Sequence, residues 1–214
     1  MSTNRISPAD RSTHTQAALL AAARPQFAAH GYAGASTEAI VRTAGVTRGA
    51  MYHHFADKTE LFAAVFAAVE REVMDRIGTV VATSGESDPV ALMRRGAGAW
   101  LDVCADPEVQ RIMLVDAPGV LGWQRFREIC LGYGLGQVHD LVAQAIAAGR
   151  IPAQPTLPLA HLLIGAMDEA ALYIAQAADQ TAARAQMGAA LDQLITALAS
   201  PRTSRPRRRR RQRS

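Results

Sequence analysis

Apolar residues recur every three or four positions along almost the whole chain, and this spacing limits the possible folds more than any other property of the sequence. Alanine and leucine, which favour helices, occupy many of these positions. Runs of β-branched residues that alternate with polar ones, as strands require, are nearly absent. The sequence therefore predicts an all-α fold, with an N-terminal three-helix unit followed by a larger helical body.

Two capping signals lie close together near the N-terminus. Ser36 can cap a short helix over 37–44, which Gly45 ends, and Thr47 can cap another over about 48–54. The few residues between these helices match the spacing of a helix-turn-helix.

Longer helices are predicted on either side of this pair. The first begins at Thr13, which can cap it, and ends near Gly31. Because an internal proline removes a backbone hydrogen bond and clashes with the preceding turn, Pro25 predicts a kink or two shorter pieces. Asp57, with Glu60 three residues later, caps a fourth helix that reaches about residue 83.

The remaining chain predicts further helices separated by clear breaks. Asp88-Pro89 and Asp106-Pro107 each combine a cap with a proline in the first helical position. The segment Asp116-Ala-Pro-Gly is expected to interrupt the pattern, and the next helix ends at Gly149. The last two helices are expected over about 159–177 and 181–199.

The helix over 159–177 is apolar nearly all round, so both of its sides need cover. Together with the last helix it could form half of a four-helix bundle between two chains. Asp168-Glu169 interrupts its apolar surface, either as a polar pair in a pocket or, the reading we favour, as a solvated patch. The residues expected at the dimer interface are Ile164, Ala171, Ile174, Met187, Leu191 and Leu194.

Charge is distributed unevenly along the chain. Residues 1–58 carry six basic and three acidic side chains, residues 59–201 nine and sixteen, and residues 202–214 eight arginines and no acid. A basic head and tail on an acidic body indicate a polyanionic partner, and nucleic acid is the obvious candidate. The expected domains are 1–57 for DNA binding, 58–84 as a connecting helix, 85–200 as the helical body that could pair with a second chain, and 201–214 as a disordered Arg-rich tail.

Composition also limits the compartment and the cofactors. No stretch reaches the ~20 uninterrupted apolar residues of a membrane-spanning helix. The polar N-terminal segment lacks the apolar stretch of a signal peptide, so we expect a cytoplasmic protein without a membrane partner. Cys104 and Cys130 are too few and too far apart for a disulfide framework or a metal knuckle, and we interpret them as core thiols. No cofactor and no metal site are expected.

Residues 27–66, FAAHGYAGASTEAIVRTAGVTRGAMYHHFADKTELFAAVF, resemble the DNA-binding domain of the tetracycline-repressor (TetR) family. The similar elements are HGY at the end of the first helix, STEAIVRTAGV, TRGAMYHHF and the DK that opens the fourth helix. Beyond residue 85 the chain is similar in helical layout and in DAPGVLGWQRFREI. The resemblance implies a ligand-responsive transcription regulator, of the repressor kind, that binds a palindromic operator on double-stranded DNA as a homodimer.

A helix of about seven residues cannot persist alone, so Val46, Met51 and Phe55 must hold it for its outer side to work. That side would then face a major groove, where Arg48 can pair bidentately with guanine. A phosphate contact by Lys58 is implied by the resemblance. The candidate DNA-contacting residues are Ser36, Thr37, Thr47, Arg48, Gly49, Tyr52, His53, His54 and Lys58.

By resemblance, the helices after residue 85 enclose a small-molecule effector site whose ligand the sequence does not identify. Aromatic, methionine and histidine side chains could line such an apolar pocket, although core packing is the simpler explanation for each of them. These candidates are Trp100, Met113, Trp123, Phe126, His139, His161, Met167 and Tyr173.

Three alternatives stay open at this point. His53-His54 could be surface histidines or a metal pair, but adjacent helical residues point about 100° apart and no third ligand is near in sequence. An enzyme could use His139 with Asp140, or Cys104 with a histidine, although neither set has the spacing of a known nucleophile elbow, zinc site or phosphate loop. A non-specific architectural DNA-binding protein would also explain the arginine tail.

Overall fold

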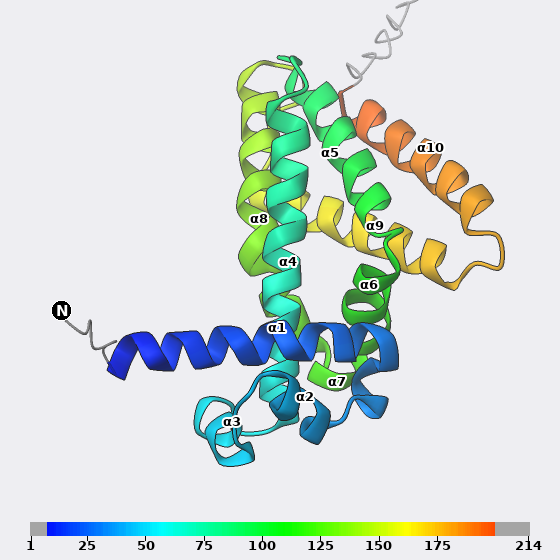
Figure 1. Cartoon of the computed structure of the whole chain (residues 1–214). Helices are drawn as coiled ribbons and strands as arrows, with labels where there is room; N and C mark the ends of the chain where they lie inside the picture. Colours follow the sequence, from blue (N-terminus) through cyan, green and yellow to red (C-terminus); the bar gives the residue numbers. More distant parts are fainter. Residues whose placement is uncertain (1–7, 200–214) are drawn as a thin grey trace, which may run out of the picture.

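The computed structural model describes residues 8–199, and every regular element among them is helical, which confirms the all-α prediction. Figure 1 shows a head made of α1, α2 and α3 beneath an upright body. The Arg-rich tail predicted over 201–214 lies outside the described residues. In chain order the elements are α1 (Pro8–Gly34), α2 (Thr37–Thr43), α3 (Arg48–His54), α4 (Lys58–Ala82), α5 (Pro89–Val103), α6 (Pro107–Val109), the π-helical turn η1 (Gln110–Asp116), α7 (Ala117–Leu121), α8 (Trp123–Ala147), α9 (Thr156–Gln176) and α10 (Gln180–Ala199).

The capping signals act as the sequence predicts. The Ser36 hydroxyl accepts a hydrogen bond from the amide of Ala39 at 3.3 Å, and that of Thr47 accepts one from Ala50 at 3.1 Å. Between the two helices, Gly45 has a φ of 67°, a left-handed conformation that costs other residues energy. These contacts turn the chain sharply between α2 and α3.

The first helix begins earlier than predicted and is not broken at Pro25, although its helical geometry is interrupted at Gly31, where it was predicted to end. It begins at Pro8, so Thr13 lies inside it, and it continues through Pro25; the non-helical residue within it is Gly31, with φ 66° and ψ 174°. Pro25 is exposed, whereas Leu19 and Phe27 on either side are buried in the core. Packing of these neighbours holds the helix straight through a residue whose ring faces solvent, where water can satisfy the freed carbonyl.

The long helix α4 connects the head to the body. The carboxylate of Asp57 accepts from the amide of Glu60 at 2.9 Å, which caps the helix as predicted. Near its start, Phe62 packs edge-to-face on Phe27 of α1 with ring centroids 5.0 Å apart. One turn later, Phe66 stacks on Phe126 of α8 at 5.7 Å. A single apolar cluster therefore runs from the head into the body.

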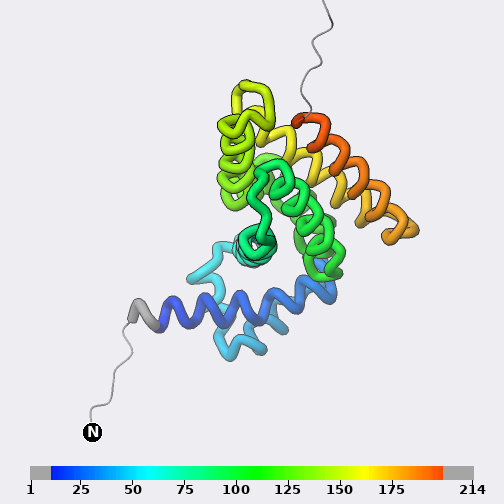
Figure 2. The backbone as a smooth tube through the Cα atoms, turned by 90° about the horizontal axis from the view of Figure 1, so that it is seen from above, coloured from blue at the N-terminus to red at the C-terminus, as the bar shows by residue number. Residues whose placement is uncertain are grey.

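In the body, α5 and α8 pack on the upper part of α4, α9 packs on α5 and α8, and α10 packs on α5 and α9 (Figure 2). In this view from above, α4 is seen end-on beside them. A second apolar cluster, which includes Val90, Met93, Val142, Leu163 and Ile195, joins these helices at the end far from the head.

The segment Asp116-Ala-Pro-Gly does not interrupt the helical path, contrary to the prediction. The chain turns as η1 up to Asp116 and then as α7, with Pro118 in the first turn, where a missing amide hydrogen costs nothing. The interruption lies at Gly122, whose φ is 74°. From there α8 runs to Ala147, and Gly149 ends it with a φ of 68°.

By length and composition, α9 is the one described helix that could cross a membrane. It nevertheless packs against α5, α8 and α10, and it carries Asp168 and Glu169 in its middle. We therefore interpret it as a helix of the bundle. Of the two sides that were predicted to need cover, the chain itself covers one, and Leu162 and Tyr173 are exposed on the other.

Candidate nucleic-acid interface and internal cavity

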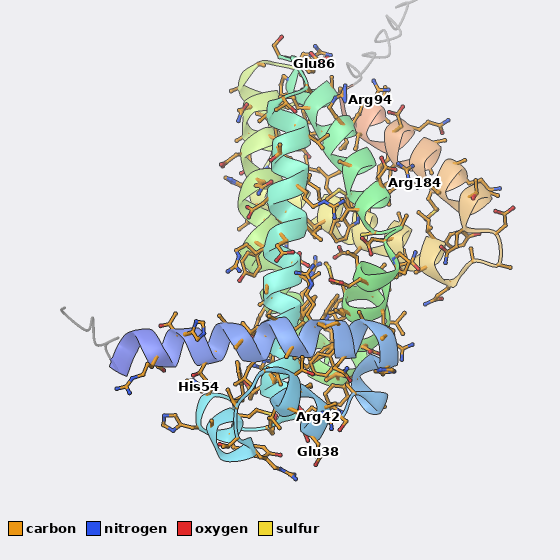
Figure 3. All side chains as sticks on the ribbon, in the orientation of Figure 1. Glu38, Arg42, His54, Glu86, Arg94 and Arg184 are labelled. Carbon is orange, nitrogen blue, oxygen red and sulfur yellow. The ribbon has the colours of Figure 1, made fainter. Side chains whose placement is uncertain are left out.

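Residues of α2 and α3 form the end of the head that points away from the body. Met51 and Phe55 of α3 are buried and anchor this helix, as expected for so short a segment. Figure 3 shows Glu38, Arg42 and His54 at this end. Of the candidate DNA-contacting residues, Thr47, Arg48, Gly49, Tyr52 and His53 are exposed, and Ser36, Thr37, His54 and Lys58 are half-buried.

Arg48 is held in place on this surface by two neighbours. Its guanidinium contacts the carboxylate of Glu38 at 3.1 Å and lies 5.6 Å from the ring centroid of Tyr52. Glu38 is itself fixed by the Ser36 hydroxyl, which donates to it at 3.0 Å. The sequence reasoning missed Glu38, although its place at the start of α2, close to the recognition helix, was a usable signal. The arrangement presents a pre-oriented arginine fork to solvent.

The other predicted contacts lie around the start of α4. The Lys58 ammonium lies 4.7 Å from the ring centroid of Tyr32, whose hydroxyl is 2.9 Å from that of Thr59. The rings of His53 and His54 are 5.5 Å apart, edge to face. Within residues 8–199, no three histidine, cysteine or acidic side chains come together as a metal site would require.

Polar contacts join the head to the body at several points. The carboxylate of Asp116 accepts from the Tyr32 amide at 2.7 Å and from Arg111 at 3.3 Å. Arg125 of α8 binds Glu60 of α4 through both of its terminal nitrogens, at 2.5 and 2.7 Å, and this pairing lowers the pKa of the Glu60 carboxyl. The first contact joins α1 to η1, and the second joins the start of α4 to α8.

A further contact comes from the middle of α1. Arg24 pairs with Glu72 of α4 at 2.7 Å and also with Glu108 of α6. Polar contacts therefore join α1 to η1 and α6 of the body and to the connecting helix α4.

A cavity of about 250 Å³ lies inside the body, between the two apolar clusters. The helix α4, which starts beside the recognition helix, supplies one wall. Apart from a few polar groups, the lining is made of aliphatic, methionine and glycine residues and one tryptophan. The lining residues are Glu70, Met74, Ile77, Gly78, Val81, Met93, Gly96, Ala97, Trp100, Cys130, Gly134, Gln137, Val138, Leu141, Leu163, Ile164, Met167, Asp168, Leu191 and Ile195.

Of the eight residues expected around a pocket, the structure brings Trp100 and Met167 to this cavity. The indole nitrogen of Trp100 donates to the backbone oxygen of Met167 at 3.0 Å, which fixes the ring between α5 and α9.

The other six predicted pocket residues do not line the cavity. Met113 and Phe126 are buried in the main apolar cluster, and Trp123 is 68% exposed beside Gly122. His139 and His161 are only half-buried, and Tyr173 is exposed. Sequence reasoning could not tell which side of each helix would face inward, because the helices of the body have broad apolar surfaces.

Two carboxyl groups lie on the cavity wall. Glu70 is 2% exposed and its Oε2 atom has no hydrogen-bond partner among the described residues. Asp168 is paired with Arg127 of α8 at 2.6 Å. Burial raises the pKa of Glu70 to about 8, with a further contribution from Asp168. Burial likewise raises the pKa of Asp168 to about 6, against the opposing effect of Arg127.

The sequence reasoning treated Asp168-Glu169 as a solvated patch, which is wrong for Asp168 and right for the exposed Glu169. It missed Glu70 altogether. The available signal was its position: Glu70 lies four residues after Phe66 and three before Val73, within the apolar stripe of α4. A charged residue in such a stripe marks either a buried ion pair or a site.

Most residues expected at the dimer interface are buried within the single chain. Ala171 is 1% exposed, Ile174 and Leu191 are also buried, and Ile164 faces the cavity. They pack on neighbouring helices, so they are not available to a second chain. Met187 is half-buried, and Leu194 is exposed. The exposed large apolar residues of α9 and α10 are instead Leu157, Leu162, Tyr173 and Leu194.

The positions of Cys104 and His139 do not support the alternative of an enzyme. Cys104 is buried, and burial raises the pKa of its thiol, so the nucleophilic thiolate is disfavoured. His139 contacts Asp140 at 3.3 Å and Thr156 at 2.9 Å on the surface of the body, away from the cavity.

Known proteins give a consistent comparison. The model of the tetR family of bacterial regulatory proteins matches residues 19–65, and the model of the tetracyclin repressor-like C-terminal domain matches residues 90–198. A crystal structure of a TetR-family transcriptional regulator from Pectobacterium atrosepticum is 34% identical, with a TM-score of 0.79 over 91% of this chain and 98% of that chain.

Curated relatives match over shorter stretches. The TetC protein of transposon Tn10 from Escherichia coli is 27% identical over 152 residues, which are 71% of this chain and 75% of that protein. The transcriptional repressor AcnR from Corynebacterium glutamicum is 38% identical over 80 residues, which are 37% of this chain and 40% of AcnR. Together with the helix-turn-helix and the ligand-sized cavity, these matches show that the chain belongs to the TetR family of ligand-responsive, DNA-binding transcription regulators, which are not enzymes.

Proposed function

We propose that the protein binds a palindromic operator as a homodimer, with one α3 helix of each chain in the major groove, and that a small molecule in the cavity controls this binding. The observation that carries the proposal is the course of α4. Its first residue, Lys58, adjoins the recognition unit, and its second half, from Glu70 to Val81, lines the cavity. A ligand that moves this wall would therefore move the head as well.

The recognition surface supports specific binding. Arg48 is exposed and pre-oriented, so it can reach the O6 and N7 atoms of guanine. Thr37 and Ser36 lie at the start of α2, where backbone amides and hydroxyls suit a phosphate. Gly49 has no heavy atom closer than 3.9 Å to the place of a side chain, so its role would be to let DNA approach the backbone.

A second chain would cover the outer sides of α9 and α10. Leu162 is 71% exposed, and Tyr173, three turns further along α9, is 51% exposed. Burying these side chains between two copies is favourable, and packing α9 and α10 of both chains gives a four-helix bundle. The two recognition helices of such a dimer must lie about 34 Å apart, one helical turn of DNA. Since operator DNA lies in the bacterial cytoplasm, the protein would act there.

Selection of binding sites from fragmented genomic DNA, followed by footprinting, tests this proposal. The expected result is a palindrome whose half-sites are centred about 10 base pairs apart or a multiple of that distance. Arg48→Ala protein provides the matched control, because it keeps the fold and removes the exposed fork. Binding spread evenly over all fragments would instead indicate an architectural protein and would contradict the proposal.

A further inference from the structure

The carboxyl group of Glu70 is anomalous in its surroundings. It is 2% exposed in the wall of the cavity, and its Oε2 atom has no hydrogen-bond partner among the described residues. Buried polar atoms are nearly always paired, and an unpaired one needs an explanation. Most of the surrounding lining is apolar, including Met74 and Ile77 one and two turns further along α4.

None of the neighbouring ionisable groups pairs with Glu70. From α8, Arg127 is engaged by Asp168 of α9 at 2.6 Å. Cys130 of α8 and Cys104 at the end of α5 are free thiols whose pKa is raised by burial, so both are neutral. Among residues 8–199, the ionisable residues that line the cavity are thus Glu70, Asp168 and Cys130, all of them acidic, and none of the lining residues is cationic.

We infer that the cavity takes a compact apolar amine, whose ammonium group donates a hydrogen bond to Glu70 and whose hydrocarbon part fills the apolar lining. This inference rests on the proposed function in taking the cavity as the effector site. A primary or secondary amine fits better than a fully substituted ammonium ion, because only a group with N–H bonds can satisfy the Oε2 acceptor.

Other ligand classes suit this wall less well. A carboxylate or phosphate would bring a negative charge beside the Asp168 carboxylate, and next to Glu70 it would be tolerated only while that carboxyl stays protonated. A neutral alcohol could satisfy the hydrogen bond but would gain nothing from the acidic lining.

The size of the cavity sets the size of the ligand. Its volume of about 250 Å³ is slightly below the range of roughly 300–1,000 Å³ that is typical of pockets for drug-sized molecules. A single ring with a short aliphatic arm is therefore the right scale. Gly78, Gly96 and Gly134 leave space along three of the walls that larger side chains would take up.

Binding of an amine should be linked to a proton. Because burial raises the pKa of Glu70 to about 8, the carboxyl is mostly protonated at pH 7 in the free protein. An ammonium ion stabilises the carboxylate, so Glu70 gives up its proton to solvent as the ligand enters. Affinity for the amine should consequently rise about tenfold from pH 6 to pH 7 and level off above about pH 8.

The test uses three probes of matched shape, 2-phenylethylamine, 2-phenylethanol and phenylacetate, in titration calorimetry of the full chain. At pH 8 the amine should bind at least about tenfold more tightly than the alcohol, and phenylacetate most weakly. Repeating the amine titration at pH 7 in two buffers with different ionisation enthalpies should show the release of nearly one proton.

Two variants assign the effect to Glu70. Glu70→Gln should bring amine and alcohol to similar affinities and abolish proton release, while Glu169→Gln, an exposed carboxyl on α9, should leave both unchanged. Circular dichroism shows whether each variant is folded. If Glu70→Gln does not fold, the pH dependence of amine affinity in the unaltered protein decides alone.

Three results would overturn the inference: no amine binding at millimolar concentration, equal or tighter binding of the alcohol or the acid, or an amine preference that survives Glu70→Gln. Operator selection without any probe is independent of these outcomes. A palindromic site found alongside a failed amine test would leave the regulator intact and reject only the ligand class.

Discussion

Arg48 is the side chain of α3 that we expect to contribute most to recognition of a DNA base. In the free protein it is held by Glu38 at 3.1 Å and lies over Tyr52. A planar arginine fork held in this way loses little freedom on meeting a base, which favours specific recognition over general attraction to phosphate.

Arg48→Ala should therefore relax the base preference at one position in each half-site, with a loss of discrimination of about ten- to a hundredfold. Lys58→Ala makes the matched contrast. The loss of a phosphate contact should weaken binding to all sequences about equally and lower the salt slope by about one unit per site. Competition assays on operator variants at several salt concentrations measure both effects. A changed preferred sequence in Lys58→Ala would contradict these roles.

Glu70 should also make the stability of the protein depend on pH. Its pKa is near 8 in the folded chain and 4.5 in the unfolded chain, so between these values the folded state binds more protons. The free energy of unfolding contributed by this group is fully present below about pH 4.5 and is lost as the pH rises towards 8, by a few kcal/mol.

Urea unfolding at pH 5, 6, 7 and 8 can isolate this effect as the difference between the unaltered protein and Glu70→Gln. The difference should move in favour of Glu70→Gln as the pH rises. Asp168, with a pKa near 6, changes the free energy of unfolding in the same direction, but its contribution is already lost at a lower pH than that of Glu70. A difference that does not vary with pH would mean that Glu70 is solvated in the folded protein.

At the scale of helices, the local signals in the sequence were reliable and the tertiary ones were not. Ser36, Thr47 and Asp57 cap their helices as predicted, because a cap depends only on the next three residues. Pro25 and the segment at Asp116 were misjudged, because burial of neighbouring side chains and the Asp116 contact with Tyr32 override local preference there.

The contrast between local and tertiary signals also explains why the DNA-facing surface could be predicted and most of the cavity lining could not. The outer side of α3 follows from its helical period, since the helix is so short that its buried residues identify the exposed ones. The cavity depends on how five long helices meet, and their apolar stripes are too wide to show which residues border a space. Trp100 and Met167 were found by residue type, whereas Glu70 was missed although its place in the apolar stripe of α4 was visible in the sequence.

The exposed sides of α9 and α10 give a prediction about assembly. Leu162→Glu combined with Leu194→Glu should yield folded monomers that bind DNA weakly, since both residues are exposed and charges there oppose a dimer. Ala171→Arg should behave differently and reduce folding itself, because its side chain is buried within one chain. Sedimentation and circular dichroism separate these effects. An unaltered protein that sediments as a monomer at micromolar concentration would reject the interface.

For the whole molecule, positive charge is concentrated near the two ends of the sequence, outside the acidic body. The eight arginines of 202–214 are its densest run. We expect a chain ending at Ser200 to lose at least about tenfold in affinity for random DNA at low salt, with a flatter salt dependence. A full-length chain with these arginines replaced by glutamine is the matched control, because it keeps the length and removes the charge. The ranking of operator variants should not change. Equal salt slopes for all three proteins would indicate a tail without a role in DNA binding.

The contacts of Asp116 with Tyr32 and of Arg24 with Glu72 and Glu108 have a consequence for engineering hybrid regulators. Exchanging residues 1–57 for the head of another family member would separate Arg24 from Glu72 and Glu108, and it would place a foreign backbone amide at position 32 beside Asp116. A hybrid would then recognise its new operator yet respond poorly to its inducer, because the linkage that transmits the signal had been cut. Transplanting the partners at 72, 108 and 116 together with the head would preserve that linkage, so the functional module for exchange is discontinuous in the sequence.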